Sequence, residues 1–285
     1  MSALVNFIKY FHPKYQKLIM EYRVSFKPRF GHGSPAHPQL MEIINSHRNE
    51  YRALLYQFLT FSEAFLSIKD APVETNEDLP AWNNSFLPGL DIVALYSLIS
   101  LIKPARYIEI GSGNSTKVAY KAIRDGELRT QIISIDPYPR ASIDRLAGEV
   151  IRKPVEDLKD YSMFAALEPN DILFIDNSHR CLPNSDATVC FLEILPILKP
   201  GVIVHVHDIY LPYDYPQFMC DRFYSEQYVL AAMVLANPVR YSPLLPNYFI
   251  SEDPELKMIL NALWSDPRLF GVESHGGSFW MKIGP

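Results

Sequence analysis

The stretch ARYIEIGSGNST, residues 105–116, decides the fold. An isoleucine-containing run of the kind that forms a buried strand leads into Gly111 and Gly113, and Ser115 or Thr116 follows where a helix cap is expected. Two glycines permit a tight turn and a close approach of the backbone to a ligand. The stretch therefore predicts a strand, a turn and a helix. By itself the Gly-x-Gly pattern is a weak indication of function, because such turns are common.

The same alternation continues on the carboxyl side of this stretch. Further strand-like runs are TQIISID, DILFID, GVIVHVHD, RYSPLLP and GGSFWMKIG, and the helix-like segments between them include STKVAYKAIRDG, SDATVCFLEILPIL and PELKMILNALW. Short runs rich in isoleucine and valine that alternate with helices are typical of a sheet covered on both faces. With one further strand expected before Glu156, as the third in the chain, these six runs, the first stretch included, predict an α/β fold with a doubly wound, mostly parallel seven-stranded sheet.

The first 80 residues differ from the rest, and we expect a helical segment there. The glycine- and proline-containing stretch FGHGSPAHP, residues 30–38, interrupts it once. After this break, apolar side chains recur at helical spacing and predict one buried stripe: Tyr51, Leu54, Leu55, Phe58, Phe61 and Phe65. We expect an N-terminal helical segment over residues 1–80 and the α/β domain over residues 81–285, with a polar, proline-rich linker around the boundary.

Composition excludes several classes of protein. The 285 residues carry a formal charge of -5 without a run of lysine and arginine, so no nucleic-acid partner is expected. The three cysteines, Cys181, Cys190 and Cys220, form no CxxC pair, and an odd number favours free thiols in a reducing compartment. We expect a cytoplasmic protein without a secretory signal or a transmembrane segment.

Two acidic residues near the glycine turn indicate the kind of ligand. Asp136 ends the strand after the turn, where an acidic residue commonly accepts hydrogen bonds from a ribose diol. Glu109, just before the glycines, suits an amine-bearing or cationic ligand better than a pyrophosphate, and Ser115 stands in place of a third glycine. These features favour S-adenosylmethionine over a nicotinamide cofactor. An NAD-dependent oxidoreductase is the alternative.

The chain resembles the class I S-adenosylmethionine-dependent methyltransferases over roughly residues 80–285. The matching residues are Glu-Ile-Gly-Ser-Gly at 109–113, Asp136, Glu156 in the stretch VEDL, and FIDNSH at 174–179. FIDNSH, together with LKPGVIVHVHDI at 198–209, is similar to a bacterial branch of that family.

The resemblance implies a site and an activity. It implies that Gly111 and Gly113 line the methionine part of S-adenosylmethionine, that Asp136 binds the ribose, and that Glu156 or Asp157 lies near the adenine. Further cofactor-binding candidates are Glu109, Ser115 and Asp176. The implied activity is methyl transfer to an oxygen, or less favourably a nitrogen, of a small-molecule acceptor. A protein that binds S-adenosylmethionine without chemistry is the alternative from another class.

Polar residues follow the fourth and fifth strands of the expected sheet. Asp176 and His179 follow one, and His207 and Asp208 follow the other, so we expect all four side chains to converge. In the first hypothesis, His207 or His179 is a general base that takes the proton of an acceptor hydroxyl, and the other polar groups orient it. The candidate catalytic residues are therefore His207, His179 and Asp208.

Two other hypotheses remain for this cluster. Asp176, His179 and Asp208 could hold Mg²⁺, as in methyltransferases of the catechol-modifying type, although Ile209 replaces the asparagine of that family. Alternatively the residues are structural, with His205 an interior, hydrogen-bonded histidine and Asp208 a cap.

Aromatic residues are candidates for the wall of an acceptor pocket. Trp82 and Phe86, with the loop IYLPYDYPQFM at 209–219, could form such a wall or could be plain packing. We expect the N-terminal helices to cover the acceptor pocket or to form a homodimer contact.

Overall fold

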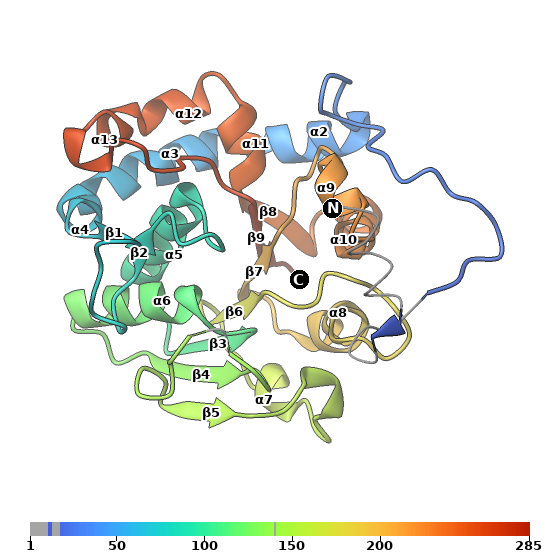
Figure 1. The fold of residues 1–285 in the computed structure, drawn as a ribbon, viewed down its shortest axis with the longest axis horizontal. Helices are drawn as coiled ribbons and strands as arrows, with labels where there is room; N and C mark the ends of the chain where they lie inside the picture. Colours follow the sequence, from blue (N-terminus) through green and yellow to red (C-terminus); the bar gives the residue numbers. More distant parts are fainter. Residues whose placement is uncertain (1–10, 13–17, 140) are drawn as a thin grey trace.

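A seven-stranded sheet with the order β5-β4-β3-β6-β7-β9-β8 forms the centre of the molecule (Figure 1). The computed structural model describes residues 11–12, 18–139 and 141–285. The first five strands of the sheet run parallel, and β9 is antiparallel to both β7 and β8. The expected α/β architecture is confirmed, and it is consistent with the Rossmann-like methyltransferase fold. The strands are β3 (Arg106–Ile110), β4 (Gln131–Ile135), β5 (Glu149–Ile151), β6 (Ile172–Ile175), β7 (Ile203–His207), β8 (Tyr241–Pro246) and β9 (Ser278–Ile283).

The central strands are buried on both faces, which explains their composition. All four residues of β6 and all five of β7 are buried. Aligned pairs place Glu109, Phe174, His205 and Trp280 in one row across four neighbouring strands, and aligned residues of a sheet share a face. Polar side chains therefore lie within the interior of the sheet as well as at its edge.

Helices cover the sheet. Helix α5 (Gly89–Ile102) is buried along almost its whole length, as its continuous apolar sequence requires, and it packs against α6 (Asn114–Asp125). The segment SDATVCFLEILPIL is helical as expected, although it consists of α8 (Asp186–Val189), a π-helical stretch (Cys190–Ile194) and a 3₁₀ turn. The remaining helices of this part are α7 (Ser162–Ala165), α9 (Gln217–Cys220), α10 (Glu226–Ala236), α11 (Asn247–Glu252), α12 (Leu256–Ile259) and α13 (Asn261–Trp264).

From residue 18 onward, the N-terminal segment is helical only after the expected break. Its helices are α2 (Pro38–Ser46), α3 (Arg48–Phe58) and α4 (Ser62–Leu66). The apolar stripe is confirmed, since Tyr51, Leu55, Phe58 and Phe65 are fully buried. The helical expectation is wrong for residues 18–29, which form no helix or strand. Most side chains there are exposed, so no apolar face is buried to offset the entropy of ordering a short helix. Most of the stretch before residue 18 lies outside the described residues.

The N-terminal segment packs against C-terminal elements. Helix α3 contacts α12, and the two lie side by side in Figure 1. The Arg48 guanidinium donates two hydrogen bonds to the carboxylate of Asp253, at 2.5 and 2.7 Å. Nearer the start of the chain, the backbone N–H groups of Arg29 and Phe30 donate hydrogen bonds to the carboxylate of Asp214, in the loop after β7, at 2.6 and 3.0 Å. The linker before the α/β domain forms a short parallel pair, β1 (Lys69–Asp70) with β2 (Ala81–Trp82).

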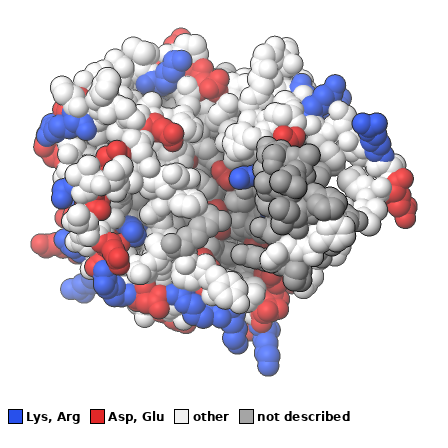
Figure 2. All heavy atoms as spheres, in the orientation of Figure 1, with Lys and Arg blue, Asp and Glu red and all other residues white. Residues whose placement is uncertain are grey.

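Charged side chains are mixed over the face shown in Figure 2, where lysine and arginine alternate with aspartate and glutamate. In the part of the chain that the structure describes, no helix has both the length and the apolar character needed to cross a membrane.

Candidate active site

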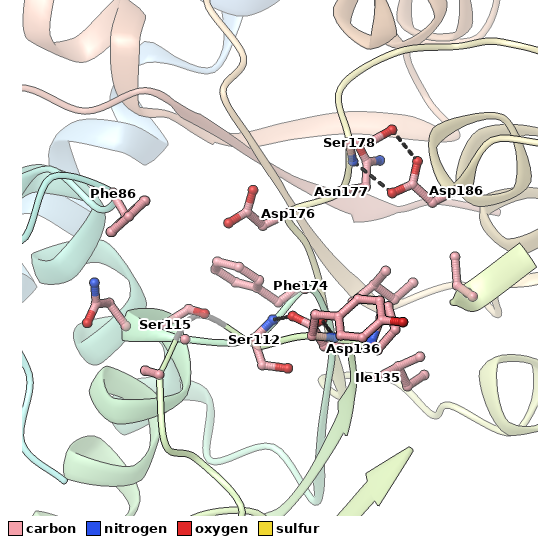
Figure 3. A pocket seen from close by; sticks show the side chains of 18 of the residues that line it. Phe86, Ser112, Ser115, Ile135, Asp136, Phe174, Asp176, Asn177, Ser178 and Asp186 are labelled. Carbon is pink, nitrogen blue, oxygen red and sulfur yellow. Dashed lines mark hydrogen bonds between the residues drawn. The ribbon is translucent and has the colours of Figure 1, made fainter. Parts of the chain in front are cut away.

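A cavity of about 690 Å³ lies at the carboxyl ends of β3, β4 and β6, the usual ligand position in a doubly wound sheet. In the view of Figure 3, Phe86 and Asp136 lie on opposite sides of the cavity and Asp176 lies between them. The candidate cofactor-binding residues that line it are Gly111, Gly113, Ser115, Asp136, Glu156 and Asp176.

The backbone at Gly111 requires glycine. Its φ is +83°, and a Cβ there would lie 1.9 Å from the backbone oxygen of Asp176. Two hydrogen bonds fix this approach, from Gly111 N to Ile135 O at 3.0 Å and from Asp176 N to Ile110 O at 2.8 Å. Gly113 differs, because a Cβ there would meet no atom of the described residues within 4 Å. Gly111 therefore shapes the turn, and Gly113 leaves open space beside the cavity.

The carboxylate of Asp136 is held by backbone donors. One oxygen accepts the N–H of Ser112 at 2.8 Å and the other accepts the N–H of Tyr138 at 2.7 Å. Each carboxylate oxygen can accept a further hydrogen bond, so the side chain is oriented and still able to bind two hydroxyl groups.

Glu156 has an acceptor without a partner. It lies in a 3₁₀ turn after β5, and its Oε2 atom is buried with no hydrogen-bond partner in the described structure. Burial raises the pKa of this carboxyl group. A buried acceptor without a donor is costly, and Glu156 lines the cavity, so a ligand with an amino group would complete the site.

Glu109 does not line the cavity. It is fully buried, and it accepts hydrogen bonds from Ser115 Oγ at 3.1 Å, from Tyr107 OH at 3.2 Å and from Thr116 Oγ1. Burial raises the pKa of Glu109 to about 8. These contacts join β3 to the first turn of α6. Cofactor binding by Glu109 remains a prediction.

The four polar residues at the carboxyl ends of β6 and β7 converge, as expected. His179 Nε2 lies 3.5 Å from Asp176 Oδ1 and 3.5 Å from Asp208 Oδ2. His207 Nε2 lies 3.9 Å from Asp208 Oδ1. Asp176 also lines the cavity, so the cavity and the polar cluster share this side chain.

His207 is oriented by a backbone carbonyl. Its Nε2 lies 3.0 Å from the carbonyl oxygen of Phe86, and a carbonyl can only accept, so Nε2 carries a proton. The other ring nitrogen, Nδ1, is buried and has no partner among the described residues. Burial lowers the pKa of His207, but the carboxylates of Asp176 and Asp208 outweigh it and leave the pKa raised.

His179 has a partner that the sequence did not reveal. Its Nδ1 lies 2.6 Å from Oε1 of Glu226, the first residue of α10, and its ring stacks on Tyr224 with 4.5 Å between centroids. Burial lowers the pKa of His179, but the charge and hydrogen bond of Glu226, with Asp176 and Asp208, raise it to about 9. Glu226 belongs to no motif, so only the fold could identify it.

His205 is interior, but it is not hydrogen-bonded. It is fully buried between Phe174, stacked at 3.9 Å, and Trp280, edge-on at 4.6 Å. Neither ring nitrogen has a hydrogen-bond partner in the described structure, so that part of the expectation is wrong. Burial holds the pKa of His205 well below its usual value.

The magnesium hypothesis gains no support. The described residues contain no group of three or more His, Cys, Asp and Glu side chains that could hold a metal ion. Of the candidates Asp176, His179 and Asp208, the histidine has Nδ1 on Glu226 and Nε2 facing both carboxylates. This is a hydrogen-bonding arrangement rather than the all-oxygen set that Mg²⁺ prefers.

The aromatic residues considered for the wall of an acceptor pocket have two different positions: one lines the cavity and the others are packed in the interior. Phe86 lines the cavity and is 52% exposed. Trp82 is buried and packs edge-on against Trp264 at 6.1 Å, so it belongs to the core. In the loop after β7, Tyr210 and Tyr215 pack against each other at 5.9 Å and are also buried.

Comparison with known families gives a match within the α/β domain. Residues 108–209, from β3 to just beyond β7, match the family model described as a methyltransferase domain. The matched segment contains the glycine turn, Asp136, Glu156 and the four residues of the polar cluster. The expected methyltransferase class is confirmed for this part of the chain.

The individual proteins to which the chain is similar share only a modest part of its sequence. An uncharacterized protein of Archaeoglobus fulgidus is 35% identical over 99 residues, which are 32% of this chain and 43% of that protein. The chain thus matches less than half the length of this relative. A methyltransferase of Podospora anserina bound to S-adenosylhomocysteine (SAH) has a TM-score of 0.43 and 17% identity, over 69% of this chain and 79% of its own. An O-methyltransferase of Bacillus cereus in complex with SAH has a TM-score of 0.38 and 17% identity, over 82% of this chain and 91% of its own.

Proposed function

We propose that the protein transfers the methyl group of S-adenosylmethionine to an oxygen of a small-molecule acceptor. One observation carries the proposal: Asp176 lines the cavity on the glycine turn and lies 3.5 Å from His179 of the polar cluster. A donor bound in the cavity would therefore lie beside groups that can orient an acceptor and remove a proton.

The cavity residues fit the donor. The open space beside Gly113 accommodates its methionine part, the Asp136 carboxylate accepts the ribose hydroxyls, and Glu156 Oε2 accepts the adenine amino group. The sulfonium group of the donor activates its methyl group, so the protein must mainly align acceptor, methyl and sulfur. A cavity of about 690 Å³ is in the size range of small-ligand sites.

Transfer to a hydroxyl releases a proton, and we assign His207 as the base. In its neutral form the Phe86 carbonyl fixes the proton on Nε2, which leaves the lone pair on Nδ1 without a partner. His179 suits this role less well, because one ring nitrogen contacts Glu226 and the other faces two carboxylates. Asp208 lies 3.9 Å from Nε2 of His207, so it would orient the ring and stabilise the imidazolium that forms when Nδ1 takes the proton.

Titration calorimetry with SAH, with NAD, and with each in the presence and absence of Mg²⁺ tests the proposal. We expect micromolar binding of SAH, no binding of NAD and no effect of Mg²⁺. An acceptor screen with purified protein and S-adenosylmethionine follows, with SAH release as the signal. Preferential binding of NAD would overturn the proposal in favour of an oxidoreductase. Binding of SAH with no turnover of any acceptor would favour a binding protein without chemistry.

A further inference from the structure

Glu226 is a buried carboxylate at the start of a helix, in contact with a histidine of the polar cluster. It is the first residue of α10, 1% exposed, and separated by 47 residues from its partner His179. Its Oε1 lies 2.6 Å from His179 Nδ1, while Oε2 is buried without a partner among the described residues. A buried carboxylate is costly unless a donor compensates it, and the imidazole is the donor that the structure provides.

Several contacts fix His179 against the start of α10. The N–H of Ser225 donates to the carbonyl oxygen of His179 at 2.8 Å, and the N–H of Cys181 donates to Ser225 Oγ at 3.0 Å. The ring stacks on Tyr224. His179 has a φ of +64°, a conformation that persists only where its surroundings determine it. The residues before and at the start of α10 therefore place both backbone and ring.

The contact with Glu226 determines what the far side of the ring presents. A carboxylate can only accept, so Nδ1 carries a proton, and the ring is then either neutral or an imidazolium. Nε2 faces Asp176 Oδ1 and Asp208 Oδ2, both at 3.5 Å. A lone pair would face two negative oxygens there, whereas an N–H attracts both. The imidazolium is therefore the form that fits these contacts.

We propose that Glu226 is a positioning residue for the methyl transfer proposed above, on which this inference rests. It holds His179 as a cation whose Nε2–H bridges Asp176, on the donor side, and Asp208, on the acceptor side. It acts through His179 and touches neither donor nor acceptor.

The test compares Glu226→Gln with the wild type in full-length protein. Glutamine keeps the size of the side chain and an acceptor oxygen but removes the charge. We expect kcat to fall about 100-fold, the effect of misplacing a reacting group by about 1 Å, with KM and the Kd of SAH nearly unchanged. Glu226→Asp, which restores the charge, should recover part of kcat. Glu255→Gln, at an exposed carboxylate that pairs with Arg48 and Arg52, is the control for the same chemical change.

A spectroscopic readout separates positioning from folding. In protein labelled with ¹⁵N-histidine, a short N–H···O contact should give a far-downfield Nδ1–H signal, assigned by its loss in His179→Asn. We expect Glu226→Gln to lose or shift this signal while SAH binding persists. An unchanged signal, or an unchanged kcat in the folded variant, would overturn the proposal. Failure of the proposed function would instead appear as absence of SAH binding by the wild type, and the signal would still report whether Glu226 holds His179.

Discussion

His207 Nε2 contacts the carbonyl oxygen of Phe86 at 3.0 Å across 121 residues of sequence. The contact joins the end of β7 to the loop whose Phe86 side chain lines the cavity. His207 thus links the polar cluster to the wall of the cavity.

Replacement of His207 by Asn should lower kcat by about 100-fold or more, the usual contribution of a general base. Asparagine is not basic, although its amide can still donate a hydrogen bond. The binding of SAH should weaken only slightly, because His207 is not among the described residues that line the cavity. Steady-state kinetics and calorimetry check this, and a variant with full kcat would refute the role of His207 as base.

The matched control is His205→Phe on the same strand. His205 is enclosed by Phe174 and Trp280, and its ring nitrogens have no partners in the described structure. Phenylalanine removes these unpaired polar atoms, so the free energy of unfolding should rise by about 1 kcal/mol while activity persists. Urea denaturation measures the change. A large loss of stability would show that the imidazole has a partner after all.

The two glycines of the turn should respond differently to alanine. Gly111→Ala places a methyl group 1.9 Å from the Asp176 oxygen at a φ of +83°, so we expect destabilisation of at least about 2 kcal/mol. The methyl group of Gly113→Ala meets no atom within 4 Å in the part of the chain that the structure describes, so stability should change little while SAH binding weakens. Thermal unfolding and calorimetry distinguish these cases. Equal effects on stability would contradict the division of roles.

Glu109 should make stability depend on pH. Burial raises its pKa from 4.5 to about 8, so between these values the folded protein binds a proton that the unfolded chain releases. Stability from this residue is complete below the unfolded pKa and is lost as the pH rises through about 8. Glu109→Gln should lack this loss. Its stability relative to the wild type should therefore rise between about pH 5 and about pH 9 in urea denaturation. A constant difference would contradict the raised pKa.

Glu156→Gln should weaken SAH binding about tenfold, the effect of losing one hydrogen bond to a charged acceptor. The neighbouring Asp157→Asn is the control, because only Glu156 has a buried oxygen without a partner and lines the cavity. Calorimetry gives both Kd values. A larger effect at Asp157 would assign the adenine contact to that residue instead.

Local patterns predicted the sheet and the meeting of its strand ends. Short, continuously apolar runs such as ILFI of β6 are typical of buried parallel strands. Parallel strands place their carboxyl ends at the same edge of the sheet, so Asp176 and Asp208 come close together whatever the path of the chain between them. The partner of His179 could not be predicted, because Glu226 reaches it only through the packing of α10. The unpaired nitrogens of His205 likewise depend on which side chains enclose the ring.

The buried stripe of α3 and the ion pair between Arg48 and Asp253 connect the N-terminal segment to elements some 200 residues later. The linker around residues 70–80 carries none of these contacts. A chain cleaved in this linker should therefore keep its two fragments associated. The two fragments share a buried apolar interface. When they are expressed as separate chains, we expect them to associate and to restore SAH binding, as the fragments of a split reporter protein do.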